Sequence, residues 1–204
     1  MRVIKYNHER VETIAEIVAD VILKGGCAVI PTDTCYGLAS NALDSKAVRK
    51  VFEVKRRDLR KVISVFVSSV DMIRDLCVVD KEVEKYLKIL PERITLVLRA
   101  KNPHMFPQGI VTSDGKIGVR LSPHPLPLLI VRKVGVPITA TSANISSTPP
   151  IYDSSEVMRS LKGIDILVDA GILPRVPPST VIDLTYKPPK ILRRGPVKIE
   201  EAQF

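Results

Sequence analysis

The sequence predicts an α/β protein with a twisted, mixed β-sheet and flanking helices. Apolar residues recur at helical spacing in some segments, and short runs of β-branched residues indicate strands in others. The two kinds of segment do not alternate strictly, which is typical of a mixed sheet in an α/β or α+β fold. The chain has 204 residues, 45% hydrophobic and 26% charged, and no composition shift marks a boundary. We therefore expect one domain over residues 1–204.

The first predicted elements are a helix, a strand and a polar loop. An apolar stripe predicts a helix over Glu9–Lys24, which Gly25 and Gly26 end. The β-branched content of Cys27–Ile30 predicts a short buried strand. The next residues, Pro31–Leu38, are rich in hydroxyl groups and small side chains and are predicted to form a loop.

Five cations occur in seven residues at Lys55–Lys61, between a predicted helix and a predicted strand. The helix covers Asp44–Val54 with Asp44 as its N-cap, and the strand covers Val62–Val67. Functional groups are often carried on such connections between rigid elements. The alternative interpretation is an ordinary solvated charged loop.

The rest of the chain adds helices and strands in mixed order. Four further helices are predicted from apolar periodicity, with Ser68 or Ser69 and Asp80 as caps of the first two: Asp71–Leu76, Lys81–Ile89, Pro123–Lys133 and one that begins at Ser154. Six further strands are predicted: Ile94–Leu98, Lys116–Leu121, Val136–Ala140, Ile166–Asp169, Thr180–Asp183 and Lys190–Arg193.

Several classes of protein are disfavoured by the composition. No segment approaches the roughly 20 apolar residues that span a bilayer, and the N-terminus lacks the apolar core of a signal peptide. The three cysteines form no Cys-x-x-Cys pair, which argues against a disulfide framework and for a reducing compartment. We expect a cytoplasmic protein with no membrane partner.

The net charge of +9 is concentrated in two segments. Residues 46–61 hold eight Lys or Arg against two acids, and residues 187–198 hold five and no acid. This distribution indicates a polyanionic partner, either a nucleic acid or a nucleotide with its phosphates.

Familiar catalytic motifs are missing, and short polar side chains at strand ends take their place. The three histidines are well separated, and there is no glycine-rich phosphate loop, so a histidine metal site or a Ser-His-Asp triad is not expected. Cys35 is a candidate nucleophile without an evident activating histidine. Scattered cations and hydroxyl groups suit phosphoryl or nucleotidyl transfer, in which positioning and charge stabilisation do most of the catalysis.

Six short motifs in order resemble those of the YrdC/Sua5 family, the threonylcarbamoyl-AMP synthases. They cover the chain from about Ala28 to Gly195: Pro31-Thr32-Asp33-Thr34-x-Tyr36-Gly37-Leu38, Lys55-x-Arg57, Val119-Arg120, Ser142-Ala143-Asn144-x-Ser146, Ser179-Thr180-Val181-Ile182-Asp183 and Ile191-Leu192-Arg193-x-Gly195. Each motif alone is short, but their succession is specific. The resemblance is to the single-domain form of the family and implies a YrdC/RibB-like sheet with a basic concave surface.

The resemblance implies a reaction and its partners. L-threonine, bicarbonate and ATP yield threonylcarbamoyladenylate and pyrophosphate, for the t6A modification at position 37 of tRNA. ATP is then a substrate, and Mg²⁺ is expected to be held through its phosphates, with no dedicated protein metal site. The product passes to a downstream threonylcarbamoyl-transferase machinery. Double-stranded RNA or tRNA is a further expected partner.

The resemblance also implies roles for individual residues. Lys55 and Arg57 are the expected catalytic pair near the triphosphate. The expected ATP-binding residues are Lys55, Arg57, Lys61, Ser142, Asn144 and Arg193. The expected threonine-binding residues are Thr34, Arg120 and Ser179, with Arg120 on the carboxylate.

Some positions depart from the family pattern. Asp58 and Val62-Ile63 stand where prolines and leucine are usual, and Ser147 replaces a usual glycine. Glu92-Arg93 stands where Gly-Pro is common, and Asp169-Ala170-Gly171 where Asp-Gly-Gly is frequent. The alternatives are therefore a related branch with another substrate, or a module that binds double-stranded RNA by its shape.

Overall fold

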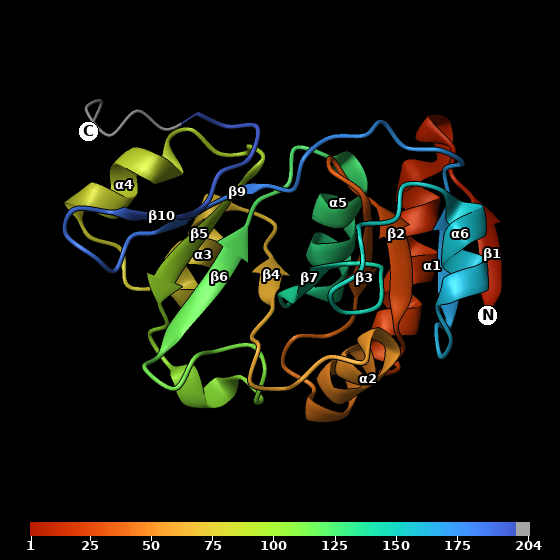
Figure 1. Ribbon diagram of the computed structural model, residues 1–204, viewed down its shortest axis with the longest axis horizontal. Helices are drawn as coiled ribbons and strands as arrows, with labels where there is room; N and C mark the ends of the chain where they lie inside the picture. The colour runs from red at the N-terminus through yellow and green to blue at the C-terminus, as the bar shows by residue number, and fades with distance from the viewer. Residues whose placement is uncertain (199–204) are drawn as a thin grey trace.

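The computed structural model describes residues 1–198. Strands from the beginning to the end of this range form one mixed β-sheet (Figure 1). Its ten strands in this part of the chain are β1 (Arg2–Lys5), β2 (Ala28–Pro31), β3 (Tyr36–Ala39), β4 (Ser64–Phe66), β5 (Ile94–Arg99), β6 (Lys116–Arg120), β7 (Ile138–Ser142), β8 (Ile166–Asp169), β9 (Thr180–Asp183) and β10 (Lys190–Arg193). Their order is β1-β8-β2-β3-β7-β4-β6-β5-β9-β10. The α/β fold class with a mixed sheet is confirmed.

Helices flank both faces of this sheet. The α-helices in the described residues are α1 (Val11–Leu23), α2 (Ser45–Lys55), α3 (Val70–Leu76), α4 (Lys81–Leu87), α5 (Pro125–Val134) and α6 (Ser154–Ser160). Two short 3₁₀ turns, η1 (His8–Arg10) and η2 (Pro103–Met105), complete the list. Helices α1 and α5 pack side by side, whereas α2 and α6 lie apart from them (Figure 1).

The apolar side chains form two cores, one on each face of the sheet. Along β2 and β8 successive residues enter different cores: Val29 and Leu167 belong to one, and Ile30 and Ile166 to the other. This alternation follows from the two-residue period of a strand, and it leaves every residue of β2 buried. The sheet is therefore held rigidly from both sides, and its strand ends make a stable frame for polar groups.

The predicted helix starts are confirmed by their caps. Asp44 accepts hydrogen bonds from the amides of Lys46 and Ala47, and Asp80 caps α4 in the same way. Of the two candidates for α3, Ser69 is the cap. Pro125 lies in the first turn of α5, as the prediction for this helix required.

Strands β1 and β3 were not predicted, and the boundaries of β7 differ from the prediction. Residues 36–39 form β3 instead of continuing the loop, because Gly37 and its neighbours pair antiparallel with β2 and β7. The N-terminal β1 was missed, since only its parallel pairing with β8 makes it a strand. Strand β7 covers Ile138–Ser142, two residues further along the chain than the predicted Val136–Ala140. Gly135 ends α5 in a left-handed conformation, and the residues directly after it form the connection to the strand.

Ser147, which stands where the family usually has glycine, adopts a left-handed backbone conformation. Its φ is +69°, and the amide of Thr148 donates to the carbonyl of Ile145, so Ser147 occupies the left-handed position of a tight turn. This position favours glycine, because a Cβ atom is strained there.

We expect Ser147→Gly to stabilise the protein by roughly 0.5 kcal/mol, since relief of strain outweighs the added chain entropy of glycine. Ser146→Gly is the matched control, because φ at Ser146 is not positive, and it should destabilise. Urea denaturation measures both changes. Equal loss of stability in the two variants would contradict the assignment of strain to Ser147.

The N-terminus of α5 depends on a neutral histidine. Nδ1 of His124 accepts the amide hydrogen of Leu126 at 3.2 Å, and burial lowers the pKa of His124 to about 4. Asp33 and His8 also face this ring, with opposite effects on its pKa. Because the pKa is lower in the folded protein than in the unfolded chain, His124 contributes stability above about pH 6.5 that is lost as the pH falls toward 4.

We expect the wild type to lose stability relative to His124→Asn by up to about 1.4 kcal/mol per pH unit between pH 6 and pH 4.5. Asparagine keeps a capping oxygen but does not titrate in this range. Urea denaturation of both proteins at several pH values measures the difference. A difference that stays constant with pH would exclude His124 as its source.

Candidate active site

A cavity of about 320 Å³ lies among strand ends and turns that are far apart in the sequence. Seven of the nine side chains predicted for the site line it: Thr34, Arg57, Arg120, Ser142, Asn144, Ser179 and Arg193. They come from the β2–β3 turn, the segment after α2, the ends of β6 and β7, and the region of β9 and β10. The remaining two, Lys55 and Lys61, are not among the lining residues.

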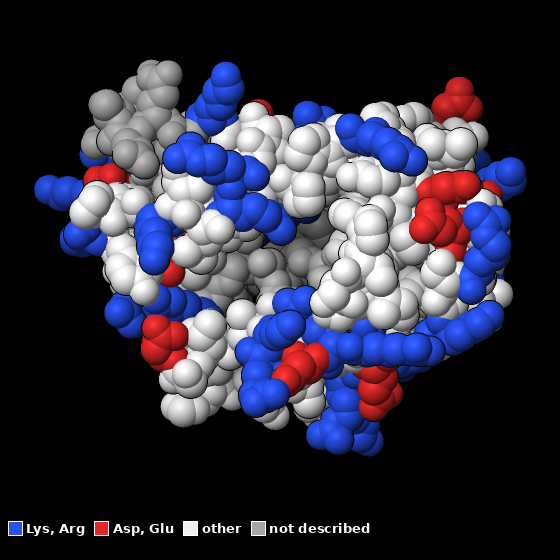
Figure 2. Space-filling model, in the orientation of Figure 1, with Lys and Arg blue, Asp and Glu red and all other residues white. Residues whose placement is uncertain are grey.

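The cavity is positively charged. Its lining includes Arg57, Arg120 and Arg193 and, among the described residues, no aspartate or glutamate. Figure 2 shows the hollow near the middle of one face, with lysines and arginines on its upper left and lower rims. The hydroxyl groups of five threonines and three serines supply further short hydrogen-bonding groups in its walls. Such a lining favours anionic ligands.

Arg120 is oriented by a buried ion pair. Its Nη2 donates to Oδ2 of Asp33 at 2.5 Å, and Oδ1 of the same carboxylate accepts the Ser122 hydroxyl at 2.5 Å. Both partners are almost fully buried. The guanidinium lies over the ring of Phe66, and its Nε is buried without a hydrogen-bond partner. The Asp33 carboxylate and the Phe66 ring therefore fix the orientation of the Arg120 guanidinium.

Arg193, the last residue of β10, is held by Ser179, which immediately precedes β9. Its Nε donates to the Ser179 carbonyl at 2.9 Å and its Nη2 to the Ser179 hydroxyl at 3.1 Å. That hydroxyl also lies 2.9 Å from Oγ1 of Thr95. Burial lowers the pKa of Arg193, and the nearby charge of Arg120 lowers it further. An anion between these two arginines would act in the opposite direction and favour their charged forms.

The close turn at Ser179 needs a glycine beside it. A Cβ atom on Gly195 would lie 2.4 Å from the Pro178 carbonyl oxygen and from the Thr180 nitrogen. The Arg-x-Gly spacing of the last motif therefore has a steric reason, because only glycine lets the chain after β10 pass this close to Ser179.

Arg57 is positioned by backbone carbonyl groups. Its Nε donates to Lys61 at 2.8 Å and its Nη2 to Val62 at 3.2 Å, while its Nη1 has no partner within residues 1–198. Burial lowers the pKa of Arg57. Lys61 contributes its carbonyl to this arrangement, and its side chain is exposed outside the cavity.

Lys55 is buried behind the cavity wall. It is 2% exposed, and its ammonium donates to the carbonyls of Ser142 and Asn144 and to Oδ1 of Asn144. The distances to the two Asn144 oxygens are 3.0 and 3.2 Å. Burial and, secondarily, the charge of Arg57 lower the pKa of Lys55 to about 8.

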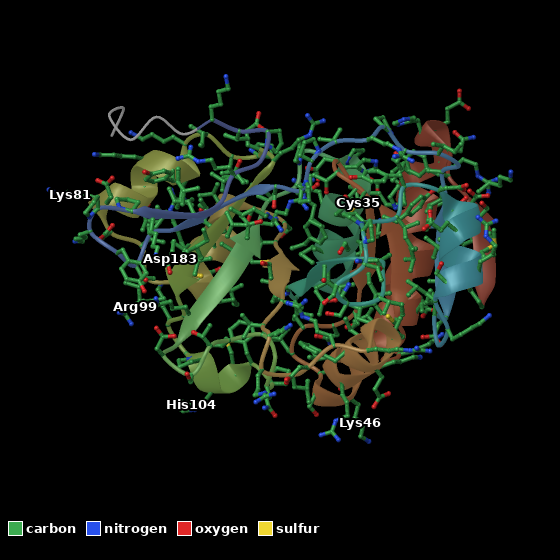
Figure 3. All side chains as sticks on the ribbon, viewed as in Figure 1. Cys35, Lys46, Lys81, Arg99, His104 and Asp183 are labelled. Atoms are coloured by element: carbon green, nitrogen blue, oxygen red, sulfur yellow. The ribbon has the colours of Figure 1, made fainter. Side chains whose placement is uncertain are left out.

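Cys35 lies in the lining, in the turn between β2 and β3 (Figure 3). Burial raises the pKa of its thiol, although Thr34, Arg120 and Lys55 act in the opposite direction. A thiol with a raised pKa is protonated at neutral pH and is a poor nucleophile. The arrangement therefore disfavours covalent catalysis by Cys35.

Among the departures from the family pattern, Asp58 and Arg93 lie outside the cavity lining, whereas Val62 and Ile63 are part of it. Asp58 forms an exposed ion pair with Arg60, at 2.5 Å, and does not line the cavity. Arg93 donates from its Nε to the carbonyl of Asp33 at 3.1 Å and so supports the β2–β3 turn. The anion at position 58 is thus neutralised locally.

Sequence reasoning missed Asp33 and Thr95. Asp33 stands inside the first motif, so its position was visible, but its role depends on contact with Arg120, 87 residues away. Thr95 lay in a predicted strand and was given no role in the site. Its contact with Ser179 depends on the parallel pairing of β5 with β9.

Within residues 1–198, no group of three or more His, Cys, Asp and Glu side chains is arranged to hold a metal ion. No helix in that part of the chain has the length and apolar character to cross a membrane. Cys27, Cys35 and Cys77 are free and buried.

Sequence comparison finds extensive similarity. The Sua5/YciO/YrdC family model, described as "Telomere recombination", matches residues 20–195. A Methanocaldococcus jannaschii protein, provisionally named a threonylcarbamoyl-AMP synthase, is 33% identical over 204 residues, covering 98% of this chain and 95% of that protein. The threonylcarbamoyl-AMP synthase of Pyrococcus abyssi is 33% identical over 210 residues. That match covers 100% of this chain but only 60% of the Pyrococcus protein.

Solved structures share the fold. The crystal structure of P. abyssi Sua5 complexed with L-threonine matches with a TM-score of 0.82 at 32% identity, over 95% of this chain and 57% of that one. The crystal structure of Escherichia coli YciO matches with a TM-score of 0.86 at 22% identity, over 98% and 97% of the two chains. The YciO match bears on the fold alone.

We expect Asp33→Asn to destabilise the protein by roughly 3 kcal/mol, because it leaves the buried Arg120 charge without its counter-ion. Asp58→Asn is the matched control, because its ion pair with Arg60 is exposed, and it should leave the free energy of unfolding nearly unchanged. Chemical denaturation measures both. Similar small losses in the two variants would mean that Asp33 does not hold Arg120 in place.

Proposed function

Because the chain belongs to the Sua5/YciO/YrdC family, we propose that it is a threonylcarbamoyl-AMP synthase. In this proposal it is a nucleotidyltransferase that converts L-threonine, bicarbonate and ATP to threonylcarbamoyladenylate and pyrophosphate. The observation that carries the proposal is a single cavity with three arginines and no carboxylate among its described lining residues. Such a cavity suits a reaction that brings two anions together.

The two substrates are assigned to different groups of residues. Arg120, Thr34 and Ser179 receive threonine, and the guanidinium of Arg120, which lines the cavity, is assigned to its carboxylate. Ser142, Asn144 and Arg193 receive the nucleotide. Of the predicted catalytic pair Lys55 and Arg57, Arg57 lines the cavity and is assigned to the triphosphate, whereas Lys55 lies behind the cavity wall. Exposed Lys61 lies on the same segment.

The chemistry proceeds without an enzyme nucleophile. The amine of threonine first captures carbon dioxide from bicarbonate, which releases water and gives the carbamate. A carbamate oxygen then attacks the α-phosphorus of ATP, and the bond to pyrophosphate breaks. The arginines lower the barrier by holding both anions in place and by neutralising charge on the departing pyrophosphate.

Mg²⁺ fits this site only through the nucleotide. The lining has no carboxylate among the described residues, and hard cations prefer oxygen ligands. The ion is therefore proposed to be held by the phosphates, and it would help to neutralise them. The protein side chains keep their own roles in binding and orientation.

The cellular setting is part of the same proposal. The product serves t6A modification at position 37 of tRNA and passes to a separate threonylcarbamoyl-transferase machinery in the cytoplasm. Residues 1–204 are proposed to act as one YrdC-like domain, because one sheet joins all described strands.

A second candidate function is RNA binding. Exposed cations cluster on α2 and on the segment that follows it: Lys46, Arg49, Arg56, Arg60 and Lys61. They lie outside the cavity, so binding of double-stranded RNA or tRNA there would be compatible with catalysis.

We expect pyrophosphate release from ATP that requires both L-threonine and bicarbonate. Arg57→Ala should lower kcat/KM at least about tenfold, which corresponds to about 1.4 kcal/mol of transition-state stabilisation. Arg60→Ala, an exposed neighbour outside the cavity, is the matched control and should retain activity. A coupled pyrophosphate assay measures both.

Release that needs no threonine would contradict the proposed substrate, and full activity of Arg57→Ala would remove Arg57 from the site. A protein that only binds RNA would release no pyrophosphate at all. Its affinity for duplex RNA would fall steeply with salt.

A further inference from the structure

Lys55 is buried and is not among the residues that line the cavity. Lys55 is the last residue of α2, and Arg56 follows it in a left-handed conformation with φ of +48°. This reversal separates the two members of the motif: Arg57 lines the cavity, and Lys55 does not. Only 2% of Lys55 is exposed.

All three hydrogens of this ammonium are used within the protein. They go to the carbonyls of Ser142 and Asn144 and to Oδ1 of Asn144. An ammonium has three donors and no acceptor, so no donor remains for a phosphate. Burial of a lone ammonium is costly, and these three oxygens are what offset the cost.

The bonds fix one wall of the cavity. Ser142 ends β7, and its hydroxyl donates to Oδ1 of Asn144. The amide of Asn144 in turn donates to the carbonyl of Thr148 at 2.6 Å, and the carbonyl of Lys55 accepts the amide hydrogen of Ser146 at 2.7 Å. The end of α2 is therefore bonded to residues 142–148 through both its side chain and its backbone.

We propose that Lys55 is a positioning residue, which holds Ser142 and Asn144 in place for the adenylate part of ATP and does not contact the triphosphate. This inference rests on the proposed function and refines the role of the Lys-x-Arg pair. Arg57 then supplies the direct contact with the β- and γ-phosphates. Lys55 affects them only through the wall that it supports.

The two roles predict different ligand profiles. A lysine that contacts the triphosphate matters for pyrophosphate and for a nonhydrolysable ATP analogue, but not for AMP. A lysine that positions Ser142 and Asn144 matters equally for AMP and for the ATP analogue, but not for pyrophosphate. Isothermal titration calorimetry with these three ligands therefore separates the roles.

We expect Lys55→Met to weaken AMP and the ATP analogue by the same factor, at least about tenfold, and to change pyrophosphate affinity less than about twofold. Arg57→Met is the matched control and should weaken pyrophosphate and the ATP analogue much more than AMP. Loss of pyrophosphate affinity in Lys55→Met with unchanged AMP affinity would overturn the inference.

Lys55→Arg keeps the folded protein testable if the methionine variant does not fold. Arginine retains the positive charge, but its planar fork does not match three oxygens arranged around one point. We expect AMP affinity to fall at least about tenfold in this variant. Retained affinity for AMP and for the ATP analogue would show that charge alone suffices and would overturn the positioning role.

The outcome also separates this inference from the proposed function. Wild-type protein that binds none of the three ligands would overturn the nucleotide site itself, and the role of Lys55 with it. Wild-type binding of all three ligands, with a Lys55→Met profile that matches Arg57→Met, would overturn only the inference about Lys55.

Discussion

Positive charge in the interior of this protein is stabilised mainly by neutral oxygens. Lys55 and Arg57 donate mostly to backbone carbonyls, and Arg193 donates to the carbonyl and hydroxyl of Ser179. Carbonyl and hydroxyl oxygens orient a cation without cancelling its charge. Of the three arginines in the cavity lining, Arg120 is the one with a buried carboxylate partner, Asp33. The cavity therefore keeps a net positive charge, and the lowered pKa values of Arg57 and Arg193 reflect the cost of burying it.

The sheet makes this arrangement possible because it brings together strand ends that are distant in the chain. Helices cover both faces, so the strands are rigid, while polar residues at their ends face a common space. Ser142 lies at the end of β7, and Ser179 immediately precedes β9. Side chains on such rigid strand ends need little rearrangement when substrates bind. This preorganisation is the main source of electrostatic catalysis.

Most of the fold was predictable, because local patterns determine most of its elements. The helices follow from apolar periodicity and from caps such as Asp44 and Asp80. Strand β3 was missed because its residues look like a loop until β2 and β7 pair with them. The residues that line the cavity were found through the order of the motifs, whereas Asp33 was missed because its importance depends on Arg120. Burial of Lys55 could not be predicted either, since its three partners lie 87 to 89 residues away.

The protonated thiol of Cys35 explains why this cavity disfavours covalent catalysis by the enzyme. Three neighbouring groups, Thr34, Arg120 and Lys55, lower the pKa of this thiol, yet burial outweighs them and the pKa is raised. The cations are committed to other oxygens, so none of them forms the direct ion pair that would stabilise a thiolate. The Cys35 thiol in the cavity lining therefore stays neutral. The positive charge of the arginines remains available to anions that enter the cavity. A site built in this way promotes reaction between two bound substrates and disfavours transfer through the enzyme.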